Sequence, residues 1–356
     1  MNKINIAVAG CGDIAHIRYF NALSQLTDKY QLVGVHDMKP EVVKKTSEEF
    51  HVKGFDTLEE LLKMEELDTV IVTTYHPSHA KIAVAAMEAG KNVIIEKPFA
   101  TCAKDARLVR DTAKRTKKLC MALPFEIYPA FAKAKQMIED GVIGKVASAD
   151  GMFAHQGPLH APWFFDKELA DWGVLADLGI YPISILSYLL GPVKAVSGKI
   201  ECLTKDRVSL AGQAFTSTVE DNVAAVLEWE NGAVATVRSN WCTAADKNGC
   251  IYSINVYGSK GIIYINMLTH ELIVYSPGKV IENAKKITYL GFDDSYVIDL
   301  PPYDDHLDIL NAYAKAHENG GMIENDGCNI DRQVNIIETI EKLYESSATG
   351  YKMDIF

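Results

Sequence analysis

The sequence predicts an α/β protein with a doubly wound parallel sheet in its N-terminal part, and an α+β domain with a large, mostly antiparallel open sheet in its C-terminal part. Short apolar runs alternate with helical patterns up to about residue 123, which is typical of parallel strands joined by crossover helices. Beyond that point, β-prone runs follow one another without intervening helices, as in antiparallel sheets. A chain of 356 residues is long enough for two domains, and we expect them at 1–123 and 124–356.

Composition and charge narrow the classes of function. Hydrophobic residues make up 48% of the chain and charged residues 23%, as in an ordinary globular protein. The net charge of −11 opposes binding to nucleic acid or to anionic membranes, and no apolar run approaches the roughly 20 residues that a membrane span requires. Seven cysteines without a CxxC pair are typical of small buried hydrophobes in a reducing compartment. We therefore expect a cytoplasmic protein with a small-molecule partner.

The first apolar run leads into a glycine-rich turn, GCGDIA at 10–15, followed by a helical pattern. Strand, GxGxxA and helix in this order are the dinucleotide fingerprint of a Rossmann domain. Gly10 allows the tight turn, Gly12 removes the Cβ that would block a pyrophosphate, and the small last residue lets helix and strand approach closely. The helix N-terminus, at Asp13 and Ile14, offers N–H groups to the phosphates.

The second strand ends at Asp37, where the fingerprint places an acid that accepts hydrogen bonds from the adenosine ribose hydroxyls. Its charge would repel a 2′-phosphate, which favours NAD over NADP. Lys39 weakens this preference because it would partly neutralise such a phosphate, so NADP stays an alternative.

Two further strand ends carry polar side chains. One strand leads to Thr74, with His76 and His79 close behind it, and the apolar strand at Asn92 ends in Glu96 and Lys97. Ligands bind at the C-terminal strand ends of such sheets, so the lysine is a candidate for chemistry, and the resemblance given below implies that this set of residues contacts the cofactor. Taken alone, the acid and the lysine are better explained as an ion pair at a turn.

The remaining elements follow from periodicity and turn signals. In the N-terminal domain we expect strands at 4–9, 31–36, 51–55, 69–74, 93–95 and 119–123, and helices at 14–26, 58–63, 80–89 and 103–116. In the C-terminal domain we expect helices ending at 140 and covering 175–190, 305–318 and 328–347, and strands at 146–154, 195–203, 223–229, 233–241, 251–257, 261–265 and 272–275. Asn231-Gly232 predicts a hairpin between two of these strands.

The helix expected at 175–190 carries a candidate reactive pair. Asp177 and Tyr181 are spaced i and i+4, on one face, and Gly179 lies between them where a bulky side chain would crowd a ligand. The aromatic run 161–166, which includes Trp163, suits either a wall for a sugar or core packing between domains.

These motifs together resemble the family of glucose–fructose oxidoreductase, inositol 2-dehydrogenase and rhizopine-catabolism proteins (Gfo/Idh/MocA). The resemblance covers nearly the whole chain. It rests on GCGDIA at 10–15, TTYHPSH at 73–79, EKP at 96–98, IEDGVIGKV at 138–146, GVLADLGIYPI at 173–183 and YESSATGYKMDI near the end. It implies a dehydrogenase that transfers hydride between a nicotinamide and a secondary hydroxyl of a sugar, polyol or glycoside, and a homodimer or homotetramer formed through the C-terminal sheet.

The resemblance also implies roles for single residues. It places Lys97 beside the nicotinamide and the reacting hydroxyl, and Asp177 at the aspartate of a DxGxH motif whose histidine is the acid/base. Tyr181 replaces that histidine, as in branches related to glucose–fructose oxidoreductase and dihydrodiol dehydrogenase. Because tyrosine titrates near ~10, a tyrosine base needs a nearby cation. We expect Tyr181 to exchange the hydroxyl proton, Lys97 to hold the oxygen and support the phenolate, and Asp177 to orient both.

The resemblance also implies further pocket residues. Glu126 stands where relatives frequently carry arginine, and either alters the charge preference for substrate or is compensated elsewhere. His155 and His160 fall in the segment that shapes the substrate pocket, and His76 and His79 border the nicotinamide. Two histidines five residues apart on an irregular segment are poorly spaced for a metal, so no metal is expected.

Two other functions stay open. A redox-neutral enzyme would keep NAD tightly bound, oxidise a sugar carbon transiently and then eliminate or epimerise. A non-catalytic NAD-dependent regulator is the third possibility, and Lys97 together with Asp177 argues against it.

Overall fold

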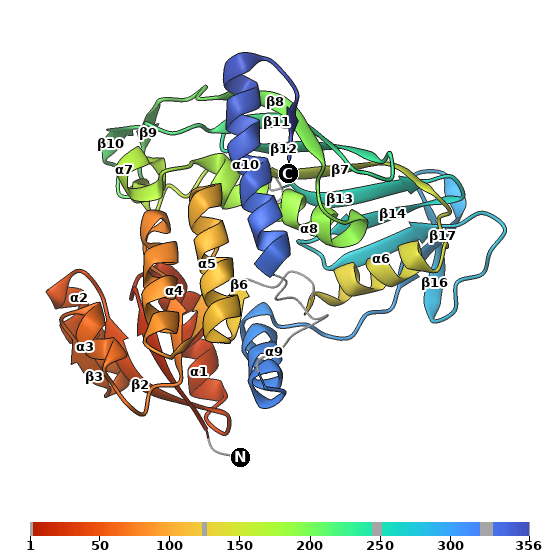
Figure 1. The fold of residues 1–356 in the computed structure, drawn as a ribbon. Helices are drawn as coiled ribbons and strands as arrows, with labels where there is room; N and C mark the ends of the chain where they lie inside the picture. Colours follow the sequence, from red (N-terminus) through yellow and green to blue (C-terminus); the bar gives the residue numbers. More distant parts are fainter. Residues whose placement is uncertain (1–2, 123–126, 244–250, 321–329, 356) are drawn as a thin grey trace. The chain divides into compact units, whose positions relative to one another are not determined.

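The computed structural model describes residues 3–122, 127–243, 251–320 and 330–355 (Figure 1). The chain forms two compact units, one made of Met1–Ile127 with Tyr303–Ile337 and the other of Tyr128–Pro302 with Glu338–Phe356. The expected division was 1–123 and 124–356. The structure differs from it because the segment Tyr303–Ile337 belongs to the same unit as the N-terminal residues. Helix α10, Ile330–Thr349, runs from one unit into the other.

The first unit contains the predicted parallel sheet. Its strands, in spatial order, are β3 (Lys53–Phe55), β2 (Tyr30–His36), β1 (Ile4–Ala9), β4 (Thr69–Val72), β5 (Asn92–Ile95) and β6 (Cys120–Ala122). All neighbouring strands are parallel, and the order reverses between β1 and β4, as in a doubly wound fold. Ile6, Ile71 and Ile94 are fully buried, which explains why the strands read as continuous apolar runs.

The helices of this sheet follow the prediction with two differences. They are the π-helix η1 (Ala15–Phe20) running into α1 (Asn21–Gln25), α2 (Pro40–Phe50), α3 (Leu58–Leu62), the 3-10 helix η2 (His76–Ser78), α4 (His79–Glu88) and α5 (Ala103–Thr116). The turn after the glycine loop is π-helical, where a continuous α-helix was expected. Helix α2 was not predicted, because only Val43 and Thr46 of its residues are buried and its apolar pattern is short.

Polar contacts explain why the late segment belongs to this unit. Helix α9, Asp305–Glu318, receives a hydrogen bond from Tyr30 Oη at the carbonyl of Leu310 (2.5 Å). Tyr313 Oη lies 2.8 Å from Thr69 Oγ1. Both bonds are buried, so α9 is fixed against the edge of the sheet where β2 and β4 begin.

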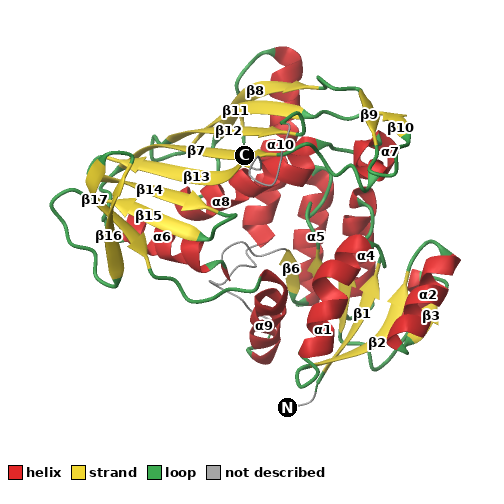
Figure 2. Ribbon diagram, turned by 180° about the vertical axis from the view of Figure 1, so that it is seen from behind, coloured by secondary structure: helices red, strands yellow, loops and turns green. Residues whose placement is uncertain are grey.

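The second unit is built on the predicted mostly antiparallel sheet, which has ten strands (Figure 2). In spatial order they are β16 (Ala284–Tyr289), β17 (Phe292–Ile298), β15 (Glu271–Tyr275), β14 (Gly261–Asn266), β13 (Ile251–Gly258), β7 (Val146–Ala154), β12 (Val234–Asn240), β11 (Asn222–Glu228), β8 (Ala195–Glu201) and β18 (Met353–Asp354). Only the β7–β12 pair is parallel among these strand pairs. The predicted hairpin joins β11 to β12, with Gly232 at φ +84°. The prediction missed strands β16, β17 and β18. It also missed a separate hairpin of β9 (Asp206–Val208) and β10 (Ala214–Thr216).

One face of this sheet is buried by helices. The helices of the unit are α6 (Pro129–Glu139), the 3-10 helix η4 (Pro162–Phe165), α7 (Lys167–Ala170), and the π-helix η5 (Leu175–Gly179) running into α8 (Ile180–Leu190). Helices α6 and α8 lie against the same face (Figure 2). At Gly151 of β7 a Cβ atom would lie only 2.5 Å from Pro182 of α8, so strand and helix approach closely there. On the opposite face Val226 and Val234 are 37% and 40% exposed.

In the described part of the chain, the helical stretch 167–190 is long and apolar enough by composition to cross a membrane. The expectation that no segment reaches this length therefore missed it. Within the stretch, 83% of the apolar window is buried inside the protein, as in the core helix of a globular domain. The apolar side chains of this segment pack against the sheet.

The described cysteines, Cys11, Cys102, Cys120, Cys202 and Cys242, are all free thiols. Cys11 and Cys120 are buried, as expected, whereas Cys242 is exposed at the end of β12. Cys102 and Cys202 are half-buried. The expectation of buried cysteines is therefore confirmed only for Cys11 and Cys120 among the described cysteines, and it is wrong for Cys242, where the chain has left the sheet.

Candidate active site

The glycine turn after β1 has the shape that a bound dinucleotide requires. Gly10 has φ +95°, and a Cβ there would lie 2.6 Å from the main chain of Thr73, so only glycine fits. A Cβ on Gly12 would meet nothing within 4 Å, which leaves the space where a pyrophosphate is expected. Asp13 is exposed and Ile14 half-buried at the start of the helix. These residues fit a dinucleotide cofactor.

Asp37 is held beside this turn by main-chain hydrogen bonds. Its Oδ2 accepts the N–H of Cys11 at 2.8 Å, and its Oδ1 accepts the N–H of Lys39 at 3.0 Å. The half-buried carboxylate is therefore fixed at the end of β2. In this position it can accept hydrogen bonds from ribose hydroxyls, as the fingerprint predicts.

The residues after β4 form a compact turn around a buried histidine. His79 is 1% exposed, with Nδ1 2.8 Å from the carbonyl of Pro98 and Nε2 2.9 Å from that of Thr74. Burial lowers the pKa of the His79 imidazole, although both carbonyls act in the opposite direction. His76 is 3% exposed and its ring lies edge-on to that of His79. His79 thus joins the end of β4 to the turn after β5.

The strand end at Glu96 carries a buried ionic network. Glu96 Oε1 accepts hydrogen bonds from Arg18 Nη1 at 2.7 Å and from Tyr19 Oη at 2.9 Å. Glu96 Oε2 accepts the N–H of Lys97 at 3.1 Å, and the Lys97–Pro98 bond is cis. Burial would raise the pKa of Glu96, but the charges of Arg18 and Lys97 hold it below the ordinary value.

The acid therefore has a specific partner of its own. Arg18 forms an ion pair with Glu96, in addition to the charge of the adjacent lysine, which also lowers the pKa of the acid. Sequence reasoning missed both Arg18 and Tyr19, although their place in the helix that follows the glycine turn was a usable signal.

In the second unit, Asp177 and Tyr181 lie on consecutive helical turns. Asp177 belongs to the π-helix η5 and Tyr181 to the start of α8, where one α-helix was expected. Asp177 is 8% exposed, and its Oδ2 accepts a hydrogen bond from Trp241 Nε1 at 3.2 Å. A Cβ on Gly179 would lie 2.6 Å from Leu175, so this glycine also serves packing within its own helix.

A stack of aromatic rings extends from Tyr181. The ring of Tyr181 lies on Phe153 with a centroid distance of 5.4 Å, and Phe153 lies on Tyr252 at 5.0 Å. His155 meets Tyr252 edge-on at 6.3 Å. His155 Nδ1 accepts the N–H of Gly157 at 2.7 Å, so in the neutral imidazole the proton is on Nε2.

The other predicted pocket residues have different described surroundings. Trp163 stacks on Phe164 at 3.9 Å, and His160 is exposed. Glu126 lies outside the described residues.

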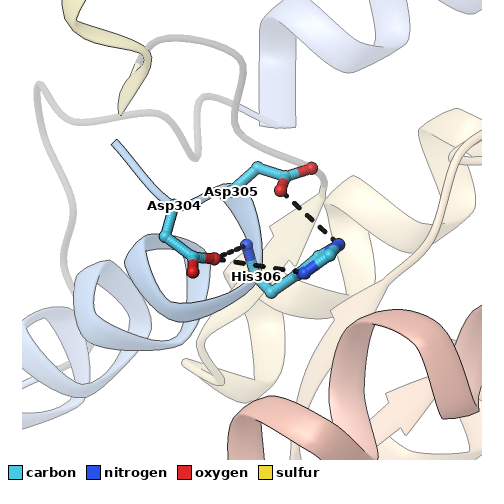
Figure 3. Close-up of side chains that lie close together, drawn as sticks. All are labelled: Asp304, Asp305 and His306. Atoms are coloured by element: carbon cyan, nitrogen blue, oxygen red, sulfur yellow. Dashed lines mark hydrogen bonds and ion pairs between the residues drawn. The ribbon is translucent and has the colours of Figure 1, made fainter. Parts of the chain in front are cut away.

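A cluster of possible metal ligands occurs at the start of α9 (Figure 3). One ligand atom from each of Asp304, Asp305 and His306 lies within 4.8 Å of the others. Asp304 Oδ1 already accepts the N–H groups of His306 at 3.0 Å and Leu307 at 3.2 Å. Its role is therefore that of a helix N-cap.

Comparison with known protein families matches both parts of the chain. Residues 4–123 match the family described as "Oxidoreductase family, NAD-binding Rossmann fold". Residues 131–264 match the "GFO/IDH/MocA C-terminal domain".

Individual relatives agree with these matches. Levoglucosan dehydrogenase of Pseudarthrobacter phenanthrenivorans is 30% identical over 221 residues, which is 56% of each chain. The scyllo-inositol 2-dehydrogenase (NAD(+)) of Bacillus subtilis is 25% identical over 281 residues, 78% of each chain. The structure of levoglucosan dehydrogenase in complex with NADH and levoglucosan has a TM-score of 0.84, covers 100% of both chains and is 21% identical, which supports a common fold. The chain belongs to the GFO/IDH/MocA family of NAD-binding oxidoreductases.

Proposed function

We propose that this enzyme oxidises a secondary hydroxyl group of a sugar, polyol or glycoside. The observation that carries the proposal is that the buried Asp177 lies one helical turn before Tyr181, whose ring is stacked on Phe153. Aromatic faces suit the C–H faces of sugar rings, and the acidic and phenolic groups suit their hydroxyls. The relatives named for levoglucosan and inositol support this substrate class.

The reaction balances as a two-electron oxidation of an alcohol. The C–H bond of the substrate breaks with its electron pair, the O–H bond loses a proton, and a carbonyl group forms. Bound NAD⁺ supplies the hydride acceptor. Tyr181 takes the hydroxyl proton, Lys97 holds the substrate oxygen, and Asp177 orients both groups.

The remaining predicted residues have supporting roles in this proposal. Gly10, Gly12 and the helix start bind the pyrophosphate, and Asp37 binds the adenosine ribose and favours NAD over NADP. His155, with its proton on Nε2, donates to a substrate hydroxyl at the end of the aromatic stack.

A substrate panel that includes glycosides, followed by NADH absorbance, tests the activity. With a verified substrate, Lys97→Ala and Tyr181→Phe should each lower kcat by a factor of about 10² to 10⁴, the range for acid/base groups. Lys63→Ala and Tyr351→Phe are matched controls, because both side chains are exposed. If both site variants kept the wild-type rate while the panel gave activity, the assigned roles would be wrong.

A redox-neutral reaction is a second candidate. A relative from Porphyromonas gingivalis named "Glycosyl hydrolase family 109 protein" is 31% identical over 153 residues, 40% of this chain. An enzyme of this kind would retain NAD through purification and convert a glycoside without net NADH. Release of NADH in proportion to product would rule it out.

We also propose that copies of the chain pair through the outer face of the ten-stranded sheet. Val226 of β11 and Val234 of β12 are partly exposed on that face, and burial of such residues favours association. The double variant Val226→Glu/Val234→Glu should be monomeric in light scattering, while Val208→Glu, on the separate β9–β10 hairpin, should keep the wild-type mass. An unchanged mass for the double variant would contradict this interface.

A further inference from the structure

We propose that Trp241 is a positioning residue for hydride transfer, because its indole N–H fixes the orientation of the Asp177 carboxylate. The inference rests on the proposed function only for the catalytic importance of Asp177. The contact itself, and the structure that supports it, are observed within one unit of the protein.

Trp241 has no freedom to turn away from the carboxylate. It follows β12 and is 1% exposed. Its Nε1–H donates to Asp177 Oδ2 at 3.2 Å, and its ring lies 4.7 Å from that of Phe165. A Cβ on Gly157 would come within 3.2 Å of the Trp241 Cβ, so the loop after β7 closes the other side.

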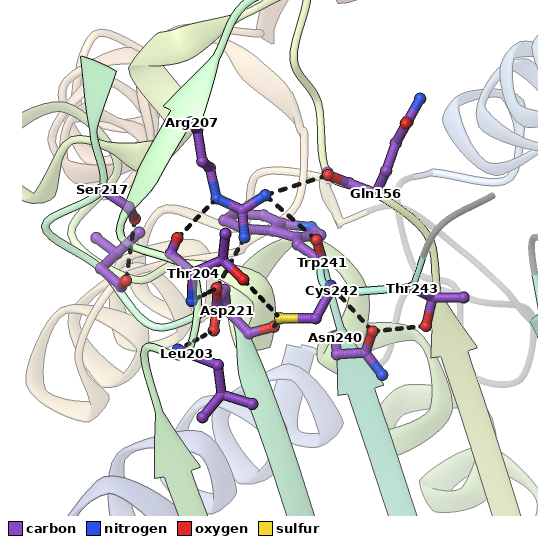
Figure 4. Close-up of polar contacts among 12 residues, drawn as sticks. Gln156, Leu203, Thr204, Arg207, Ser217, Asp221, Asn240, Trp241, Cys242 and Thr243 are labelled. Carbon is purple, nitrogen blue, oxygen red and sulfur yellow. Dashed lines mark hydrogen bonds and ion pairs between the residues drawn. The ribbon is translucent and has the colours of Figure 1, made fainter. Parts of the chain in front are cut away.

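The main chain of Trp241 is held by a buried ion pair (Figure 4). The Trp241 N–H donates to the carbonyl of Asp221 at 2.8 Å, and Arg207 Nη1 donates to the carbonyl of Trp241 at 3.2 Å. Arg207 Nη2 and Asp221 Oδ2 are 2.7 Å apart, with side chains 6% and 0% exposed. Asp221 therefore holds the N–H of Trp241 and Arg207 holds its carbonyl group.

This ion pair is anchored to the rest of the domain. Asp221 accepts the N–H groups of Leu203 at 2.7 Å and Thr204 at 2.8 Å. Burial would raise the pKa of Asp221, but these hydrogen bonds and Arg207 hold it below the ordinary value. The carboxylate stays charged at neutral pH, so the support of Trp241 persists under working conditions.

Arg207 connects the same support to the loop after β7. Its Nη1 also donates to the carbonyl of Gln156 at 3.2 Å, and its guanidinium lies 4.8 Å from the ring of Phe165. The indole, the loop after β7 and the β9–β10 hairpin thus share one anchor. A reacting group needs such preorganised support, because small errors in orientation are costly in rate.

The alternative is that Trp241 only fills the core. The chain contains a matched residue for this comparison. Trp229 is 3% exposed in the same unit, and its Nε1–H also makes one hydrogen bond, to the carbonyl of Gly191 at 2.8 Å. Replacement of either tryptophan by phenylalanine removes one buried indole and one hydrogen bond, but only Trp241 contacts Asp177.

The contact is tested without any substrate by NMR of the indole N–H groups. The chain has four tryptophans, so four indole signals are expected, and Trp241→Phe and Trp229→Phe assign two of them. Asp177→Asn should shift the Trp241 signal and leave that of Trp229 unchanged. An unshifted Trp241 signal overturns the inference.

The consequence for the reaction is tested by a double-mutant cycle in the full-length protein loaded with NAD⁺. Trp241→Phe should lower kcat at least tenfold and change KM by less than about threefold, and Trp229→Phe should leave both near wild type. In an Asp177→Asn background, Trp241→Phe should cause no further loss, because its effect passes through the carboxylate.

The outcomes separate this inference from the proposed function. The positioning role is overturned if Trp241→Phe lowers kcat equally in the wild-type and Asp177→Asn backgrounds. It is also overturned if Trp241→Phe and Trp229→Phe lower kcat equally. If Asp177→Asn alone keeps the wild-type rate, the proposed role of Asp177 fails and the positioning role fails with it, while the NMR result still decides whether the contact exists.

Discussion

Arg18 Nη1 and Glu96 Oε1 lie 2.7 Å apart, with side chains only 11% and 4% exposed. The arginine comes from the π-helix that follows the glycine turn, and the glutamate directly follows β5. Because Glu96 also accepts the N–H of Lys97, the ion pair fixes the main chain on which the candidate catalytic lysine is carried. The cofactor turn and the lysine are therefore held by one buried contact.

Removal of the arginine should be strongly destabilising. Arg18→Met leaves a buried carboxylate without its cation, which typically costs about 3–5 kcal/mol of unfolding free energy. Glu96→Gln in the same background should recover part of the loss, since no charge remains to be compensated. Urea denaturation at pH 7 measures both values.

An exposed pair provides the control for this prediction. Arg115 pairs with Glu88 at 59% and 49% exposure, and Arg115→Met should cost much less unfolding free energy than Arg18→Met, because exposed ion pairs contribute little. If Arg18→Met lowered the free energy of unfolding no more than Arg115→Met, the buried pair would not be a major source of stability.

Asp37 should decide between the two nicotinamide cofactors. Asp37→Ser removes a charge that repels a 2′-phosphate and an acceptor for the ribose hydroxyls, while Lys39 remains nearby. The ratio of kcat/KM for NADP⁺ to that for NAD⁺ should rise at least about tenfold, since one charged hydrogen bond is worth about 1.5–3 kcal/mol. Asp28→Ser, at an exposed residue before β2, is the control, and an unchanged ratio in Asp37→Ser would contradict the assignment.

The parts of the fold that could be predicted are those with strong burial patterns. Strands such as β4 and β5 are buried on both faces, so they appear as apolar runs, and the strand-end motifs follow directly. Helix α2 buries only two side chains, and β16 has no buried position, because its residues are half-buried or exposed along its whole length. Elements of this kind carry too little apolar signal to be found in a single sequence.

The same reasoning applies to the site. Lys97, Asp177 and Tyr181 stand in short motifs, so they could be named from the sequence. Trp241 is 64 residues from Asp177 along the chain, and Arg18 is 78 residues from Glu96. Such partners are single residues of common type, and only the folded chain brings them to the groups that they support.

The buried imidazole of His79 should make stability depend on pH. Burial lowers its pKa below the ordinary value of about 6.5, so the unfolded chain binds this proton more tightly than the folded protein. The stability contributed by neutral His79 is therefore present above about pH 6.5, and it is lost as the pH falls toward the lower folded value.

His79→Gln removes this titration. The difference in unfolding free energy between wild type and variant should be largest above pH 7 and should shrink in more acidic solution, measured by urea denaturation from pH 8 to pH 5. His51→Gln, at an exposed position, is the control for the change of residue type. A difference that stays constant across this range would contradict a neutral buried imidazole.

Glu220 should stabilise the start of the helical stretch that carries Asp177. Its Oε1 accepts the N–H groups of Gly173 at 2.8 Å and Leu175 at 3.1 Å. Glu220→Ala leaves both donors without this acceptor and should cost about 1–3 kcal/mol of unfolding free energy. It should also lower kcat, because Asp177 lies in the first turn of the helix.

The matched variant Glu220→Gln keeps an acceptor oxygen and removes the charge. Burial raises the pKa of Glu220, although Tyr344 and the main-chain N–H groups oppose the shift. A carboxyl group with a raised folded pKa contributes stability that is complete below about pH 4.3, the ordinary value, and is lost as the pH rises through the folded value. Glu220→Gln should therefore gain stability relative to wild type between pH 4 and pH 8, and it should keep more of the wild-type kcat than Glu220→Ala. Equal kcat and equal stability for the two variants would mean that this oxygen does not hold the helix.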